Sequence, residues 1–341
     1  MLFVLAIGDR RRASSRLRVW DHLEALEGII TPGRSDCVVP TALVGRPAAL
    51  ALRLLCRAPL WLWWFARARV VYIQETLILW PLVSIAARLG GKRVIFDFSD
   101  PVDSIGHGLK RALRRFAFDR MVHGADHVIV ENRCYQRDLP RNDVIQFYGP
   151  VNVTRYQAGR AAAPQRRLDA PLRVGWTGSP GTLHFIAPLF PHLDALAGEM
   201  KIELTLIGVT QVDYPFRHLP TTCLPWNEEL EFAEVPKFDI GLHRLDQSSL
   251  SLKRGAGKIF IYMAAGVPFV TDARGIGANV VAESGAGTIV AKDADWPDRL
   301  RDILTDQPAR REHAERGMDF ATTEMSYDVF RGLLKHLMCE S

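Results

Sequence analysis

The chain has 341 residues, of which 48% are hydrophobic and 24% charged, values that exclude a largely disordered or fibrous protein and indicate about two folded domains. Its five cysteines are scattered without a C-x-x-C pair, which argues against a disulfide framework or structural zinc and favours a reducing cytoplasm. The net charge is +5, and residues 1–150 carry 22 Lys and Arg against 14 Asp and Glu. This basic half predicts an anionic partner, such as a membrane surface, lipid phosphate, acidic glycan or nucleic acid.

Short apolar runs predict β-strands along the whole chain, with helical stretches between most of them. We interpret the first run, MLFVLAIG, as a strand and not as a signal peptide, because the basic residues follow it. The alternation predicts an α/β fold of parallel sheets with helices on both faces. The expected strands are Leu2–Ile7, Val70–Ile73, Val94–Phe98, His127–Glu131, Val144–Phe147, Leu172–Trp176, Ile202–Ile207, Asp239–Leu242, Pro268–Thr271 and Gly287–Val290.

Residues 157–171 show no hydrophobic periodicity and predict a linker between two doubly wound domains. Ligands of such sheets bind at the carboxyl ends of the strands. We therefore expect a binding cleft between the two domains, with both sets of strand ends directed at the ligand.

A basic loop lies between two expected strands in the second half of the chain. It runs from Lys253 to Lys258 (KRGAGK) and precedes a small-residue helix, Ile259–Ala265. Cations and free backbone N–H groups at a helix N-terminus favour phosphate, which makes Lys253, Arg254 and Lys258 candidate ligands. The two glycines suggest a conformation that glycine adopts most easily. A solvated basic turn is the alternative.

A second glycine-containing loop, Gly175–Thr182 (GWTGSPGT), follows the first strand of the second half. Glycine allows a backbone to approach a ligand closely, so Gly178 and Ser179 are candidates for phosphate contact. A simple strand-to-helix turn would explain the same sequence. Trp226, further along, could stack on a nucleotide base or serve only in packing.

In the first half, the segment FDFSDP places Asp97 and Asp100 at the end of a strand. Carboxylates at the carboxyl end of a parallel strand face the ligand crevice, where they can bind hydroxyl groups of a ligand or act as a base. An Asp that caps the turn before Pro101 is the alternative. His107 and His123 are weaker candidates.

The motifs of the second half resemble the nucleotide-sugar-binding core of GT-B glycosyltransferases, specifically the retaining family 4 (glycosyl transferases group 1). The matching parts are GW-x-G-S from Gly175, DIG from Asp239, the basic turn with its GK, and YMA-x-G-x-P-x-V from Tyr262. The resemblance implies a GT-B fold with two Rossmann-like domains facing a cleft. Residues 1–155 would bind the acceptor and residues 156–324 the nucleotide sugar, with a last helix at about 325–341 packing back on the first domain.

The resemblance also implies a function, which is the transfer of a hexose from a nucleoside diphosphate sugar to a lipid-linked or polysaccharide acceptor. The reaction would retain the anomeric configuration and need neither a metal nor another cofactor. The implied roles are donor phosphate binding for Gly178, Ser179, Lys253, Arg254 and Lys258, base contact for Trp226, catalysis for Asp97, Asp100 and Lys258, and acceptor contact for Arg16 and Arg18. Arg16 and Arg18 are two residues apart on a helix, so at most one should enter the cleft, and we favour Arg16.

One position departs from the family pattern. Many members have a Glu that holds the ribose where this chain has Ile261. Asn279, Glu283 or backbone groups would have to substitute for it. Two other functions therefore stay open, a sugar-nucleotide epimerase and a non-catalytic nucleotide- or glycan-binding protein.

The segment from Arg46 to Arg67 mixes arginines with leucines and with Trp61, Trp63 and Trp64, a composition found in helices that lie on anionic membranes. Pro47 and Pro59 should prevent one continuous helix, and burial of the tryptophans is equally compatible with the pattern. A second basic helix is expected at Lys110–Arg120. The chain has no recognised nucleic-acid motif. We therefore expect a cytoplasmic protein that contacts the inner face of the cytoplasmic membrane.

Overall fold

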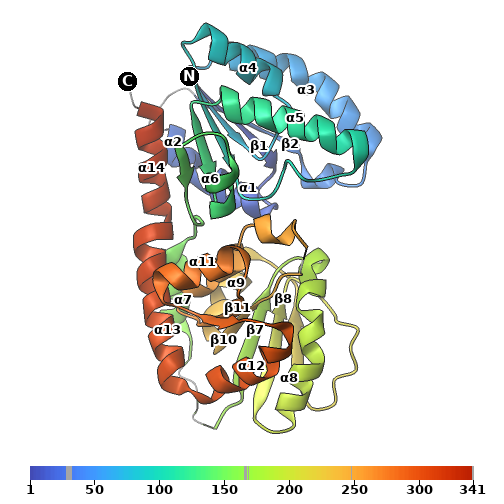
Figure 1. Ribbon diagram of the computed structural model, residues 1–341, viewed down its shortest axis with the longest axis vertical. Coiled ribbons are helices and arrows are strands. Elements are labelled where there is room, and N and C mark those ends of the chain that lie inside the picture. Colours follow the sequence, from blue (N-terminus) through green and yellow to red (C-terminus); the bar gives the residue numbers. More distant parts are fainter. Residues whose placement is uncertain (28–32, 165–166, 168, 247, 340–341) are drawn as a thin grey trace. The chain divides into compact units, whose positions relative to one another are not determined.

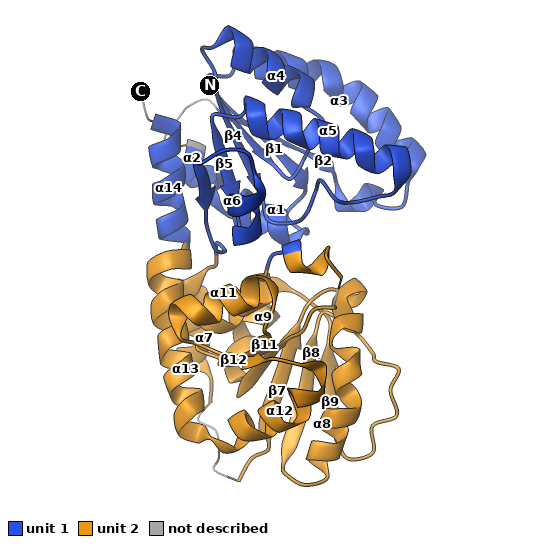
Figure 2. Cartoon of the chain, in the orientation of Figure 1, with its two compact units in different colours: residues 1–150, 253–255, 327–341 blue, residues 151–252, 256–326 orange. Residues whose placement is uncertain are grey.

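The computed structural model describes the chain except for residues 28–32, 165–166, 168, 247 and 340–341. The chain divides into two compact units (Figure 2). Unit 1 comprises Met1–Pro150, Lys253–Gly255 and Tyr327–Ser341, and unit 2 comprises Val151–Leu252 and Ala256–Ser326. Each unit contains a parallel six-stranded sheet with helices packed against it (Figure 1).

In unit 1 the strand order is β2-β1-β3-β4-β5-β6. Helices α3, α4 and α5 cover one face of this sheet around a core that includes Phe96 and Phe118, and α2 and α14 cover the other face. The strands are β1 (Leu2–Gly8), β2 (Gly33–Val39), β3 (Val70–Gln74), β4 (Arg93–Phe98), β5 (His127–Val130) and β6 (Val144–Gln146). The helices are α1 (Ala13–Arg18), α2 (Leu23–Glu27), α3 (Pro47–Arg67), α4 (Trp80–Leu89), α5 (Gly108–Gly124), α6 (Arg133–Asp138) and α14 (Tyr327–Cys339).

In unit 2 the strand order is β12-β11-β10-β7-β8-β9. One core cluster joins this sheet to α8 and α12 and includes Trp176 and Trp296. The strands are β7 (Leu172–Thr177), β8 (Ile202–Ile207), β9 (Thr221–Leu224), β10 (Ile240–His243), β11 (Phe269–Asp272) and β12 (Thr288–Val290). The helices are α7 (Val153–Ala162), α8 (Phe190–Ala197), α9 (Glu228–Glu234), α10 (Gly257–Ala264), α11 (Gly275–Ser284), α12 (Trp296–Thr305) and α13 (Gln307–Phe320).

The predicted parallel α/β architecture is confirmed, and every predicted strand is present. The prediction omitted β2 and β9, which are the outermost strands of their sheets. Both are only partly buried, and β2 includes the charged residues Arg34 and Asp36. An edge strand lacks the continuous apolar run by which a central parallel strand is recognised.

The predicted linker at residues 157–171 is wrong over its first part, because α7 occupies Val153–Ala162. The side chain of Asn152 caps this helix by accepting a hydrogen bond of 3.2 Å from the Arg155 amide. The buried ring of Tyr156 packs on Phe232, with ring centroids 4.6 Å apart. Tertiary packing of a weakly amphipathic segment, rather than sequence periodicity, therefore stabilises α7.

The prediction that Pro47 and Pro59 break the arginine-rich segment is also wrong, because α3 is continuous from Pro47 to Arg67. Pro47 occupies the start of the helix, where no intrahelical N–H is needed. Pro59 leaves the carbonyl of Leu55 without its helical partner, but Leu55 is 74% exposed, so water can bond that carbonyl. Among the described helices, α3 alone is long and apolar enough to cross a membrane, and only 11% of the qualifying window is buried.

Candidate functional site

The carboxyl ends of β7 and β8 meet at two glycines in unit 2. The Gly178 amide donates a hydrogen bond of 2.9 Å to the Ile207 carbonyl, which ties the two strand ends together. Gly208 has a φ of +100°, and a Cβ at this residue would lie 1.9 Å from the Gly178 carbonyl oxygen. Only glycine fits at position 208, and it holds the Gly178 backbone in place at the ligand-binding edge of the sheet.

Lys258 lies beside Gly178. Its Nζ is 5.4 Å from the centroid of the Trp176 ring. A Cβ on Gly178 would lie 2.7 Å from Cε of Lys258 and 2.6 Å from Cζ2 of Trp176. The structure thus brings together two candidates from separate motifs, in the first turn of α10 and at the end of β7. A cation beside a glycine backbone and a helix N-terminus is suited to bind a phosphate.

A layer of buried polar groups lies along the same strand ends. The Thr177 hydroxyl donates to Oε1 of Glu231 at 2.7 Å, and the Tyr262 hydroxyl donates to the Leu242 carbonyl at 3.1 Å. His243 lies 2.9 Å from the Thr271 hydroxyl. Burial, assisted by the charge of Lys258, lowers the pKa of His243 to about 3, so its ring is neutral at pH 7. The positive charge of this cluster therefore comes from Lys258.

Asp97 and Arg18, predicted separately as a catalytic group and an acceptor contact, are joined inside unit 1. Nε of Arg18 donates to the Asp97 carboxylate oxygens at 2.8 and 2.9 Å, and the Tyr72 hydroxyl also donates to this carboxylate. Asp97 and Tyr72 are fully buried, and burial raises the pKa of Asp97 against the opposing effect of Arg18. Arg18 and Asp97 therefore form a buried ion pair within unit 1. Their proposed roles in acceptor contact and catalysis stay predictions.

The other candidates of the first half differ in exposure. Arg16 is buried in unit 1, and its role as the preferred acceptor contact stays a prediction. Asp100 is half-buried in the turn after β4, and its role stays a prediction.

Lys253 and Arg254 are grouped with unit 1, whereas Lys258 belongs to unit 2, so the three cations do not gather within one unit. Nζ of Lys253 pairs with Asp138 at 3.2 Å, and the Arg254 carbonyl accepts a hydrogen bond of 3.0 Å from Asn132. Neither Gly255 nor Gly257 has a left-handed φ, so the predicted glycine conformation is wrong. A Cβ on Gly255 would lie 2.3 Å from Oε1 of Glu131, whereas a Cβ on Gly257 would meet nothing within 4 Å.

The predicted nucleoside contacts lie on different elements of unit 2. Trp226 is 37% exposed ahead of α9, Asn279 is half-buried on α11, and Glu283 is exposed on the same helix. Their roles stay predictions. Ile261, at the position of the family Glu, is buried in α10.

Two of the buried carboxylates that escaped the sequence analysis lie close to the carboxyl ends of β7 and β3. One is Glu231, the acceptor of the Thr177 hydroxyl. The other is Glu75, directly after β3, which has a left-handed φ of 53° and accepts hydrogen bonds from the hydroxyls of Ser14, at 3.0 Å, and Ser99. A carboxylate close to the end of a strand is the signal that identified Asp97, and Glu75, two residues after the apolar run VVYI, has the same signal.

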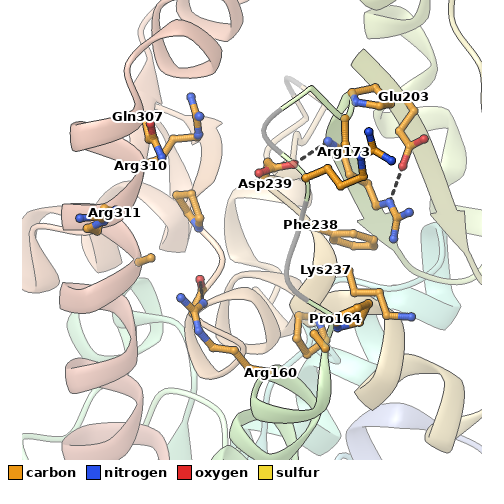
Figure 3. A pocket seen from close by; sticks show the side chains of 18 residues that line it. Arg160, Pro164, Arg173, Glu203, Lys237, Phe238, Asp239, Gln307, Arg310 and Arg311 are labelled. Carbon is orange, nitrogen blue, oxygen red and sulfur yellow. Dashed lines mark hydrogen bonds and ion pairs between the residues drawn. The ribbon is translucent and has the colours of Figure 1, made fainter. Parts of the chain in front are cut away.

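The described residues contain no group of three His, Cys, Asp or Glu side chains that could hold a metal ion. A cavity of about 640 Å³ lies at the opposite, amino-terminal ends of the strands of unit 2 (Figure 3). Its lining includes Arg173, which donates to Glu203 at 2.6 Å, and the cavity contains none of the predicted site residues. The candidate site at the carboxyl ends is therefore separate from this cavity.

No protein-family model and no curated protein matches the sequence. Solved structures do match over nearly the full chain. Sucrose-phosphate synthase from Thermosynechococcus elongatus aligns with a TM-score of 0.69 and 12% identity over 99% of this chain and 98% of its own. HepE from Anabaena, solved with UDP-glucose, aligns with a TM-score of 0.68 and 12% identity over 99% of both chains. WaaG, a glycosyltransferase involved in lipopolysaccharide biosynthesis, aligns with a TM-score of 0.65 and 13% identity over the whole of both chains.

These structures define the class of fold. With its two parallel six-stranded sheets, the chain has the GT-B fold of these glycosyltransferases, as the sequence motifs predicted.

Proposed function

We propose that the protein is a retaining, metal-independent glycosyltransferase that moves a hexose from a nucleoside diphosphate sugar to a lipid-linked or polysaccharide acceptor. The observation that carries this proposal is the contact between Gly178 and Lys258 at the carboxyl edge of the unit 2 sheet. It lies in a GT-B fold similar to that of HepE, whose structure contains UDP-glucose. Unit 2 would bind the donor and unit 1 the acceptor.

The proposed reaction exchanges one bond at the anomeric carbon. The acceptor hydroxyl oxygen bonds to this carbon on the face from which the nucleoside diphosphate leaves. The bond between the anomeric carbon and the phosphate oxygen breaks, and the leaving phosphate takes the electron pair and the acceptor proton. Lys258 stabilises the charge that develops on this phosphate, a role that a metal ion fills in other enzymes.

Surrounding groups support Lys258 in this role. His243 is neutral and therefore adds no second positive charge beside Lys258. The Trp176 ring lies within cation–π distance of the Lys258 Nζ. On the acceptor side, Asp100 and Glu75 follow neighbouring strands, β4 and β3, where an acceptor hydroxyl could be bound. A lipid-linked acceptor would place the protein in the cytoplasm, at the inner face of the cytoplasmic membrane.

The first test is thermal unfolding of the full chain with UDP, GDP, ADP, CMP and dTDP. A ligand at about 100 times its Kd adds about 2.7 kcal/mol of stability. We expect a shift with one nucleoside diphosphate that is lost in Lys258→Ala and kept in Lys292→Ala, a matched control at an exposed lysine of unit 2. No shift with any nucleotide, or an equal shift in Lys258→Ala, would contradict the donor assignment.

The second test measures turnover with a set of hexose derivatives of the nucleoside diphosphate identified in this way, with and without a chelator. Sugar transfer to an added lipid-linked or polysaccharide acceptor supports the proposal, and loss of transfer on chelation contradicts metal independence. An epimerase would release epimerised nucleotide sugar without an acceptor. Binding with no turnover on either acceptor class would assign the protein to the non-catalytic alternative.

A further inference from the structure

Helix α3 presents an apolar face to the solvent. Leu52, Leu55, Leu62 and Trp63 are 50–74% exposed, and Pro59 lies exposed among them. At about 100° per residue, these positions fall within about 100° of the helix circumference. Single exposed apolar residues are common and scattered on protein surfaces. A continuous apolar face along a long helix instead indicates a site of interaction.

The neighbouring helix α5 adds a second apolar stripe. Leu109, Leu113 and Phe116 are 50–76% exposed and lie one turn apart. Helices α3, α4 and α5 pack on the same face of the unit 1 sheet, so their outer sides form one layer (Figure 1). The apolar surface therefore extends over more than one helix.

This layer is strongly basic. The sequences of α3, α4 and α5 contain nine Lys and Arg and a single acidic residue, Asp119. Exposed arginines stand at both ends of α3, with Arg46 ahead of it and Arg67 at its end, where the guanidinium lies 5.1 Å from the Trp63 ring centroid. Aromatic and cationic side chains at the border of an apolar face are typical of helices that lie in a membrane interface.

The inner side of α3 is bound to the rest of unit 1. This attachment favours a helix that lies on a membrane over one that crosses it. Asp36 on β2 pairs with Arg53 at 2.7 Å and accepts a hydrogen bond of 2.9 Å from the Trp61 indole. Trp61 and Trp64 are buried in the core of unit 1. Insertion across a bilayer would break these contacts and leave Asp36 charged and unpaired, which is costly.

We propose that α3 and α5 form a surface that docks on an anionic membrane, with the Leu52–Trp63 side of α3 dipping into the interface. The inference deepens the proposed function by naming the surface through which the enzyme would reach a lipid-linked acceptor. This link to the acceptor rests on the proposed function, whereas binding of the surface to anionic lipid does not. Anionic lipid is favoured over a second copy of the chain, because two layers with the same excess of cations repel each other.

The test is co-sedimentation of the full chain with phosphatidylcholine vesicles containing roughly one-third phosphatidylglycerol, at low and high salt. We expect the wild type to bind and Leu55→Glu/Leu62→Glu to bind at least tenfold more weakly. Arg46→Gln/Arg67→Gln should bind at least fivefold more weakly and also show a weaker salt dependence. Val329→Glu is the matched control, because Val329 is an exposed apolar residue of α14, on the other face of the sheet, and it should bind within about twofold of the wild type.

Circular dichroism and thermal unfolding without ligand verify that each variant is folded, and vesicle binding is measured without donor or acceptor. A failed nucleotide test with intact vesicle binding would therefore contradict only the proposed function. Absence of binding to the anionic vesicles, or equal binding by wild type and Leu55→Glu/Leu62→Glu, would overturn the membrane proposal. The membrane proposal would also be overturned if the wild type did not bind vesicles but formed a dimer, and Leu55→Glu/Leu62→Glu converted this dimer to a monomer.

Discussion

The Arg18–Asp97 pair provides the sharpest test of the structure, because the sequence motifs assigned both residues to the active site. The perturbation is Arg18→Met, which keeps much of the side-chain volume and removes the charge. It takes from Asp97 both hydrogen bonds of Nε and the ion pair of Nη2, which lies 2.8 Å from Oδ1. The Tyr72 hydroxyl stays as a donor to the carboxylate.

The expected cost follows from burial. Both side chains are at most 1% exposed, so the remaining Asp97 must either stay charged without its partner or take up a proton. Removing one member of such a buried pair costs about 3–5 kcal/mol. The Tyr72 donor and the already raised pKa of Asp97 place the value near the lower end, at about 3 kcal/mol. The double variant Arg18→Met/Asp97→Asn should cost less than the sum of the single variants by about 1–3 kcal/mol.

The assay is urea unfolding at pH 7 for the wild type, both single variants and the double variant, with nucleotide binding as a separate readout of unit 2. A cost below about 1 kcal/mol for Arg18→Met, or strict additivity in the cycle, would refute the structural role. Transfer activity supplies the second criterion. Asp97→Asn at a temperature where it is folded should retain substantial kcat if the pair is structural, and a loss of a thousandfold or more with native stability would assign Asp97 a catalytic role.

Two further predictions concern unit 2. Gly208→Ala should lower the free energy of unfolding by about 2 kcal/mol or more and abolish nucleotide binding, because its Cβ would collide with the Gly178 carbonyl at a positive φ. The measurement is thermal unfolding. Gly181→Ala is the control, because there is open space around its Cβ, and it should change stability by less than about 0.5 kcal/mol. His243 has a pKa of about 3 in the folded protein and about 6.5 when unfolded, so only the unfolded chain gains its proton as the pH falls, and stability decreases with falling pH between these values. From pH 7 to 5 the wild type should lose about 2 kcal/mol more than His243→Gln in urea unfolding, and a constant difference between the two would contradict the burial of a neutral ring.

The central strands of both sheets could be predicted from sequence because each is an apolar run buried on both faces. The strand β2 could not, since its position at the sheet edge allows charged residues such as Asp36. Asp36 is nevertheless the residue that fixes α3, through Arg53 and Trp61, and no local pattern indicates this pairing. The sequence also could not predict that α3 continues through Pro59, because this depends on the carbonyl opposite the proline facing water.

For the candidate site, the sequence by itself determined the residue types and their order along the chain. It identified Gly178 and Lys258 because glycine turns and cations ahead of a helix are local signals for phosphate. Only the tertiary structure decided which candidates meet. It placed Lys258 against Gly178 and joined Arg18 and Asp97 in a buried ion pair within unit 1. The physical reason is that a charged side chain looks the same in a sequence whether it faces a ligand or an opposite charge in the core, and only packing distinguishes the two.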